Sequence, residues 1–410
     1  SVGVGNGAGK YATGSANTFV GSSAGLGGTT SAPYSSGKYN VAIGYQALTG
    51  FTTGGNNTAI GYLALNDNTS ASNNVAVGAD ASHKGTTANK NVAVGNLASY
   101  FNETGIYNVS IGYETMKGTS GQSHSNNVAV GYQALTSVTT GGSNVAIGTS
   151  AGNSLTSGGS NIMIGNGVAT TLSTGGSNVI IGTLAGIAVS EGEKNILIGR
   201  DAGKDISSGD SNIAIGYQAL YVENTGTYAV AIGYRSGYKT RLSAQNENVF
   251  IGANAGRENT DGNDNVYIGF GAGYGQDGEN PTSNVAIGNH ALGKARNNEN
   301  VAIGHEAGFY ATGSQNTFIG KDAGKGGTTS APYSSGNKNI AIGYQALTGF
   351  TTGFENIAIG YEAGEDITTG YYNTLIGYEA GESLTTGYGN IFMGYEAGAS
   401  KIVNVGSIAI

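Results

Sequence analysis

The sequence contains no cysteine and no tryptophan, only three prolines, and few charged residues. Without cysteine, disulfide bonds and thiolate metal sites are excluded. Charged residues make up 11% of the chain, against about 25% in an average protein, and the net charge of −8 includes no basic stripe. We therefore expect no nucleic-acid partner. No apolar run reaches the ~18 residues that span a bilayer, so we expect no membrane insertion in this segment.

Glycine, in contrast, is abundant, and many of its 74 residues close one recurring motif. Versions of the pattern Asn-apolar-x-apolar-Gly, as at 40–44, occur 23 times, and most intervals between their glycines are 17 residues. A fixed period of this kind is typical of a solenoid with one coil per repeat. A disordered low-complexity chain has no reason to keep its apolar pairs in register. We predict an all-β, parallel β-solenoid or β-roll of about 24 coils.

This repeat array is predicted to form one continuous domain over residues 1–410. The chain begins without methionine and ends at Ile410, one glycine short of a further motif, so we expect it to be a fragment of a longer fibre. Within a repeat, the residues three before and directly before the glycine are almost always Val or Ile, which indicates a short strand. A second β-prone run, such as 51–53 or 138–140, predicts a second strand in each coil. Glycine and asparagine are expected to supply the positive φ angles of the turns.

An asparagine opens 21 of the 23 motifs. One interpretation is an amide ladder, in which each side chain bonds to the next coil. The other is turn propensity alone, and the sequence leaves both open.

Two longer intervals between motifs contain the same insert, near residues 26–38 and 325–337. Loops on solenoids are frequent binding faces. The candidate receptor-loop residues in these inserts are Pro33, Tyr34, Pro332 and Tyr333.

The middle residue of each predicted strand is almost always apolar and never charged. If its two neighbours point into the core, the middle residue must point outward. An outward position that stays apolar over more than twenty coils predicts a face packed against another chain. On this argument we expect an obligate homo-oligomer, with an interface that includes Phe19, Ala42, Ala146, Ile180, Ala214, Phe250, Phe318 and Phe392.

The motif also resembles known repeats. Asn144-Val145-Ala146-Ile147-Gly148 is similar to the repeat of trimeric autotransporter adhesin heads. The longer form, with Tyr-Gln-Ala-Leu and Thr-Thr-Gly, resembles repeats of phage tail fibres and related bacterial surface fibres. The resemblance covers nearly the whole chain and implies a left-handed β-roll, a homotrimer, and an extracellular location on a virion or a bacterial cell surface. Adhesin heads use repeats shorter than 17 residues, so the resemblance bears more directly on the fold than on head-type receptor binding.

The function that follows is a structural fibre shaft that projects a receptor-binding tip for attachment to a host or surface. The alternative is that the shaft itself is the adhesin and binds a cell-surface glycan or protein through its loops and its tyrosines. We expect no enzyme activity, cofactor or metal site, because the four histidines form no ligand pair and no catalytic motif is present. Ice binding is a further rival, but many coils lack the threonine pair that a flat array requires.

Tyrosine and glutamate each recur at a fixed position of successive repeats, and both patterns predict contacts between coils. Tyrosine follows the motif glycine in ten copies, which predicts a stacking ladder across coils, with a platform for sugars as the alternative. Glu362, Glu379 and Glu396 occupy the same phase of adjacent repeats, so their carboxylates are expected to stack about 4.8 Å apart. Repulsion between them would raise their pKa above the usual value near 4.3.

Overall fold

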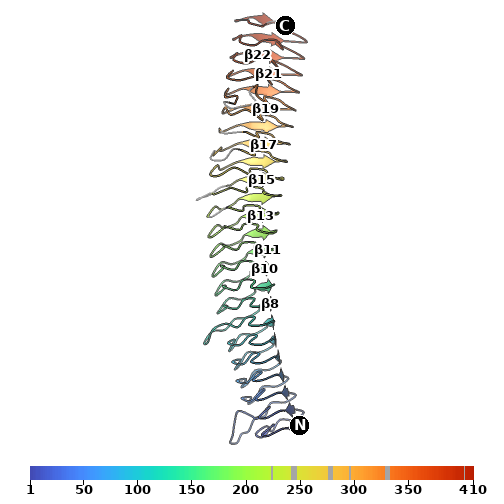
Figure 1. The fold of residues 1–410 in the computed structure, drawn as a ribbon, viewed down its shortest axis with the longest axis vertical. Coiled ribbons are helices and arrows are strands. Elements are labelled where there is room, and N and C mark those ends of the chain that lie inside the picture. Colours follow the sequence, from blue (N-terminus) through green and yellow to red (C-terminus); the bar gives the residue numbers. More distant parts are fainter. Residues whose placement is uncertain (223–224, 242–246, 276–279, 295–296, 328–332, 401) are drawn as a thin grey trace. The chain divides into compact units, whose positions relative to one another are not determined.

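The computed structural model describes residues 1–222, 225–241, 247–275, 280–294, 297–327, 333–400 and 402–410. These residues form a parallel β-solenoid in which each coil contributes one short strand and a set of turns (Figure 1). The chain divides into two compact units, residues 1–201 with 207–209, and residues 202–206 with 210–410. Within the described part of the chain, no helix has the length and apolar character needed to cross a membrane.

Each unit contains twelve strands. The first unit holds β1 (Val2–Val4), β2 (Thr18–Val20), β3 (Val41–Ile43), β4 (Thr58–Ile60), β5 (Val75–Val77), β6 (Val92–Val94), β7 (Val109–Ile111), β8 (Val128–Val130), β9 (Val145–Ile147), β10 (Ile162–Ile164), β11 (Val179–Ile181) and β12 (Ile196–Ile198). The second holds β13 (Ile213–Ile215), β14 (Val230–Ile232), β15 (Val249–Ile251), β16 (Val266–Ile268), β17 (Val285–Ile287), β18 (Val301–Ile303), β19 (Thr317–Ile319), β20 (Ile340–Ile342), β21 (Ile357–Ile359), β22 (Thr374–Ile376), β23 (Ile391–Met393) and β24 (Ile408–Ala409).

Within each unit, successive strands pair in parallel and in register. In β3 and β4, for example, Ala42 lies opposite Ala59 and Ile43 lies opposite Ile60. The identical phase of the motif in every coil produces this register, because each strand meets the same residues of the next coil. The solenoid fold and the 17-residue period are thus confirmed.

The predicted second strand is wrong. Residues 51–53 and 138–140 form bends, and they bond to the next coil in a different way. The backbone N–H and the hydroxyl of Thr52 both donate to the carbonyl of Thr69, and Thr69 donates its hydroxyl to Thr86 in turn. Threonine is enriched here because its hydroxyl adds a second donor to each link between coils, a role that β-propensity does not distinguish from strand formation.

The glycine that closes the motif has a positive φ, about 133° at Gly148. A Cβ atom added at Gly148 would lie 2.2 Å from the carbonyl oxygen of Gly165 in the next coil. Glycine is therefore required here twice, by the backbone conformation and by the close stacking of coils. Positive φ angles also occur at residues other than Gly and Asn, for example 52° at Gln46 and at Leu48, where tertiary packing overrides the local preference.

The middle residue of each strand points into the coil, and its two neighbours point outward. In β3, Ala42 is fully buried while Ile43 is 39% exposed. The core of this coil is completed by Ala47, Leu48 and Phe51 from the turns, all fully buried. The predicted orientation of the strand is therefore reversed.

Side-chain volume in the core explains why the middle residue varies between Ala and large residues. Coils with Ala in the middle of the strand commonly carry Leu four residues after the motif glycine, as Ala42 with Leu48. Coils with a large middle residue carry a small residue at that site, usually glycine as in Phe318 with Gly324, and alanine in Met163 with Ala169. A Cβ atom at Gly324 would lie 2.0 Å from the Phe318 ring. The two positions share one volume, and close packing requires one of them to shrink when the other grows.

The motif asparagines form a buried amide ladder, which decides between the two interpretations. The Oδ1 atom of Asn144 accepts hydrogen bonds from the backbone N–H of Asn161 (2.9 Å) and from its Nδ2 (3.1 Å). Asn161 Nδ2 also donates to the carbonyl of Gly175 at 2.9 Å. Asn161 repeats the same pattern toward Asn178. The ladder satisfies buried backbone groups that the three-residue strands leave unpaired.

Candidate functional site

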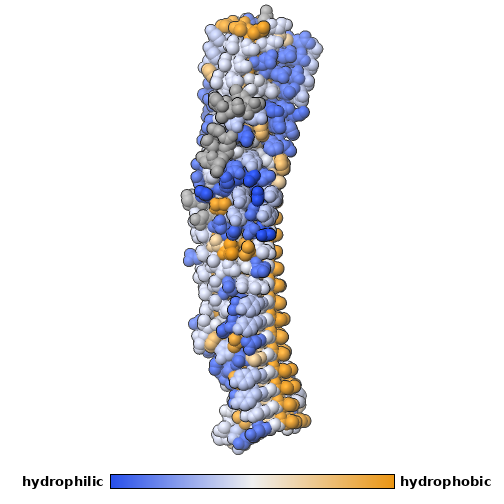
Figure 2. Space-filling model, viewed as in Figure 1, coloured by the Kyte–Doolittle hydropathy of each residue, from blue (hydrophilic) through white to orange (hydrophobic). Residues whose placement is uncertain are grey.

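The first and third residues of the strands form two outward-facing columns, which we call the outer columns. In β1–β23 every outer residue is Val, Ile, Thr or Met. Ile43 and Ile147 are each 39% exposed, and Val20 is 37% exposed. Figure 2 shows a continuous hydrophobic stripe along the right edge of the first unit, where Figure 1 places the strands. Mostly apolar side chains thus cover one face of each unit, and no charged residue interrupts them in β1–β23.

The residues predicted to lie between chains are instead enclosed by their own coils, at 0–1% exposure. They are Phe19, Ala42, Ala146, Ile180, Ala214, Phe250, Phe318 and Phe392. Their assignment to an interface is wrong, because a side chain surrounded by its own coil cannot contact another chain. The surface that remains available for association is the pair of outer columns.

The predicted tyrosine ladder is present. Tyr344, Tyr361, Tyr378 and Tyr395 stack in successive coils with ring centroids 5.0–5.1 Å apart and nearly parallel planes. Shorter stacks occur elsewhere, as at Tyr45 and Tyr62. The stacking geometry fits offset aromatic pairs, which add to stability beyond their buried area.

The insert residues lie beside this type of ladder. Tyr34 stacks on Tyr11, with centroids 6.3 Å apart, and is 44% exposed. Tyr333 stacks on Tyr310 at 5.8 Å. Pro33 is exposed, and Pro332 lies outside the described residues. The two tyrosines thus extend the aromatic surface of the coil that precedes each insert.

Acidic side chains gather near the C-terminal ladder, where the sequence predicts a stack of Glu362, Glu379 and Glu396. The cluster joins Glu362, Glu365 and Glu382, whose carboxylate oxygens lie within 4.8 Å of one another. Burial, followed by the negative charge of Glu362, raises the pKa of Glu365, and burial followed by Glu379 raises the pKa of Glu382. A hydrogen bond to Glu379 helps to raise the pKa of Tyr378 to about 12. The carboxylates of Glu362, Glu379 and Glu396 each hydrogen-bond to the tyrosine that precedes them in the ladder.

The double substitution Glu365→Gln and Glu382→Gln is expected to reduce the loss of stability that the protein undergoes between pH 4 and pH 7. Because the folded pKa of each glutamate lies above its unfolded value, the folded state binds more protons. The contribution of each glutamate to the stability of the folded state is complete below the unfolded pKa and is lost as the pH rises through the folded pKa. Melting temperatures of both proteins at the two pH values measure the effect. Parallel pH dependences in the two proteins would contradict it.

A second cluster joins His305, Glu306 and Asp322. Here Lys325 already provides the opposite charge, since its Nζ lies 2.5 Å from Glu306 and 3.2 Å from Asp322. The Lys325 ammonium holds the pKa of Glu306 below its usual range. This cluster is therefore an ion-pair network that links neighbouring coils.

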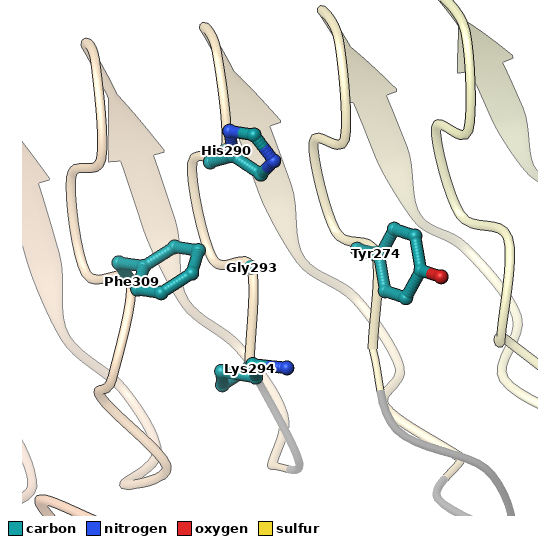
Figure 3. Close-up of a pocket in the computed structure, with 5 residues that line it drawn as sticks. All are labelled: Tyr274, His290, Gly293, Lys294 and Phe309. Carbon is teal, nitrogen blue, oxygen red and sulfur yellow. The ribbon is translucent and has the colours of Figure 1, made fainter. Parts of the chain in front are cut away.

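A hollow of about 250 Å³ lies in the second unit, lined by Tyr274, His290, Gly293, Lys294 and Phe309 (Figure 3). These residues come from three successive coils. The repeat motif does not predict this hollow, because the hollow exists only where residue 293 lacks a side chain. The signal was a single glycine in a column that carries Tyr or Phe in neighbouring coils.

Comparisons with family models, with curated proteins and with solved structures found no match. The functional argument therefore depends on the surfaces described above.

Proposed function

We propose that this chain is a shaft segment of an extracellular fibre, in which three copies associate along their outer columns. The shaft would hold a receptor-binding tip away from a phage tail or a bacterial cell surface. This location and the number of chains follow the repeats that the sequence resembles. The outer columns are the observation that carries the proposal.

An apolar face of this kind favours a permanent partner. Contiguous apolar patches on soluble monomers usually measure about 300–600 Å². Each unit repeats the pair of outer residues over twelve strands, which extends the patch well beyond that size. A second copy of the same chain is the natural occupant, because it presents a matching column with the same spacing between coils.

The arrangement of the columns favours a closed ring of chains. In a cyclic trimer, each chain meets two neighbours through two different patches. The solenoid offers two such patches in every coil: the column of first residues, as Val145, and the column of third residues, as Ile147. One column can face each neighbour, and both are then removed from water.

A structural role also fits the way the coils are joined. Within each unit the strands repeat the same parallel pairing, and within the amide ladder Asn residues bond to the next coil, as Asn144 and Asn161 do. The energy of a repeat array is approximately a sum of such neighbour terms. A shaft must resist unfolding at every coil, and similar links between neighbouring coils provide that resistance.

Light scattering by the full chain is expected to give a mass three times the chain mass of 41.0 kDa. The reason is that separated chains would leave both outer columns in water, at a cost of about 25 cal/mol for each Å² of apolar area. The mass should remain unchanged at high salt, because the contact is apolar and is not screened. A folded protein with the mass of one chain would contradict the proposal.

A further inference from the structure

The hollow at Gly293 interrupts a column of side chains that lies five residues after each motif glycine. Before the interruption the column carries Tyr221 and Tyr238, which stack at 5.1 Å, and later Tyr274. Phe309 follows in the next coil after Gly293. The column thus lacks one side chain between two aromatic residues.

Two neighbouring rings lean over glycines at the border of this space. A Cβ atom at Gly293 would lie 2.3 Å from Cε2 of Phe309, so the Phe309 ring lies over the glycine. His290 in turn leans over Gly271, where a Cβ atom would lie 2.7 Å from its Cδ2. Figure 3 shows Phe309 and Tyr274 on opposite sides of Gly293, with His290 on one remaining side and Lys294 on the other. Gly293, Lys294 and the three rings therefore line a hollow that is open on one side.

Its polar groups are a cation and a hydrogen-bond acceptor. Lys294 has no ion pair and no side-chain hydrogen bond with the described residues, although its backbone N–H donates to Phe309. His290 Nδ1 lies 2.6 Å from the amide oxygen of Asn289, which can only accept. In the tautomer that donates from Nδ1 to this oxygen, Nε2 is an acceptor, and it lies above Gly271.

We propose that this hollow binds one acidic sugar residue, a hexuronate within a glycan. The C–H face of a pyranose ring would lie against Phe309 and Tyr274, its carboxylate would pair with the Lys294 ammonium, and a hydroxyl would donate to His290 Nε2. The volume of about 250 Å³ is slightly below the range of roughly 300–1,000 Å³ for drug-sized ligands, which suits a single ring. The nearby Glu306 carboxylate is neutralised by Lys325 and does not oppose the anion. The site gives the shaft a binding role that is independent of chain association.

Saturation-transfer NMR on the full chain with methyl glucuronide and methyl glucoside tests this site. A single ring is expected to bind with a Kd on the order of 1 mM. The glucuronide should bind about five-fold more tightly than the glucoside, because only the acid can pair with Lys294. Equal binding of the two sugars, or displacement of the glucuronide by an equal concentration of inorganic phosphate, would overturn the proposal.

Two variants locate the binding. Gly293→Tyr should abolish transfer to both sugars by filling the column. The Phe309 ring, 2.3 Å from the added Cβ, has to move, so circular dichroism and the melting temperature of the variant must show that the fold is kept. Lys294→Gln should retain the glucoside signal and lose the preference for the acid. The matched control is Lys90→Gln, since the Lys90 Nζ also lies beside a tyrosine ring, 4.8 Å from that of Tyr107, but does not line this hollow. Full glucuronide binding by Gly293→Tyr, or an unchanged preference in Lys294→Gln, would refute the site.

Discussion

Replacing Ile147, Ile164 and Ile181 with glutamate is expected to separate the assembled chains while each chain stays folded. The three residues are the third positions of β9, β10 and β11, so they form one stretch of an outer column. Light scattering should shift from three times the chain mass toward one chain mass. Circular dichroism of the separated chains should retain the β signal.

The reason is the different cost of a carboxylate in the two states. In a single chain, a glutamate at residue 147 extends into water from a position that is already 39% exposed. Between chains, the same carboxylate is buried without a partner, at a cost of several kcal/mol for each ion. A cyclic trimer would place the three substitutions of every chain in one contact region, where like charges add to the penalty.

Ala146→Glu provides the matched control, because it places the same side chain one residue away. Ala146 is fully buried and lies opposite Met163 in the next strand, so a glutamate there must enter the core of the coil. The expected result is local unfolding around β9, with loss of hydrogen-exchange protection. The opposite result would contradict the proposal. If Ala146→Glu dissociated the chains without unfolding the coil, and the three isoleucine substitutions left the chains associated, the outer columns would not be the contact.

The sequence predicts the repeat and its register more firmly than the direction of its side chains. The motif glycines fix the period, and the asparagine at 144 or 161 fixes the phase of each strand. A strand with three successive apolar residues, such as Val145-Ala146-Ile147, has no polar position to mark the solvent side, so period-two reasoning gives two equal solutions. We expected the larger Val and Ile to be inside, and the structure places the smaller Ala there.

The pairing of residue sizes contains the missing information. A large middle residue, as Phe318, accompanies glycine at 324, and Ala42 accompanies Leu48. Two positions that exchange volume must share one cavity, and only an inward strand position can share a cavity with a turn of its own coil. This relation is readable in the sequence alone. The hollow at Gly293 is harder to predict from the sequence, because its shape depends on how the rings of His290 and Phe309 lean over neighbouring glycines.

Asn161→Ala is expected to destabilise its own and the adjacent coils by about 2–5 kcal/mol. The substitution removes the two bonds that Asn161 Nδ2 donates and the two that its Oδ1 accepts from Asn178. The backbone N–H of Asn178 and the carbonyl of Gly175 then lose these partners while they remain buried. Each buried polar group without a partner costs about 1–3 kcal/mol, which exceeds the net value of the bond itself.

Hydrogen exchange measured by mass spectrometry is the suitable readout, because a repeat array can open locally without global unfolding. Protection of the backbone between residues 144 and 195 should fall by a factor of about 30 or more. Asn166→Ala is the matched control in the same coil, since Asn166 is exposed and should change stability by less than about 0.5 kcal/mol. Equal effects of the two substitutions would mean that the ladder contributes nothing beyond turn propensity.

The reverse substitution, Ala229→Asn, tests the ladder at β14, whose motif opens with alanine in place of asparagine. The backbone N–H of Ala229 donates to Asn212 Oδ1 at 3.0 Å, so the bond from the preceding coil is already in place. An asparagine there would add Nδ2 as a second donor to the same oxygen, as Asn161 does toward Asn144. Protection of the backbone of β14 should then rise, because a fully buried site gains a bonded amide in place of a methyl group. A decrease would show that the core around Ala229 is packed for the smaller residue, so that volume and not hydrogen bonding sets the ladder at this coil.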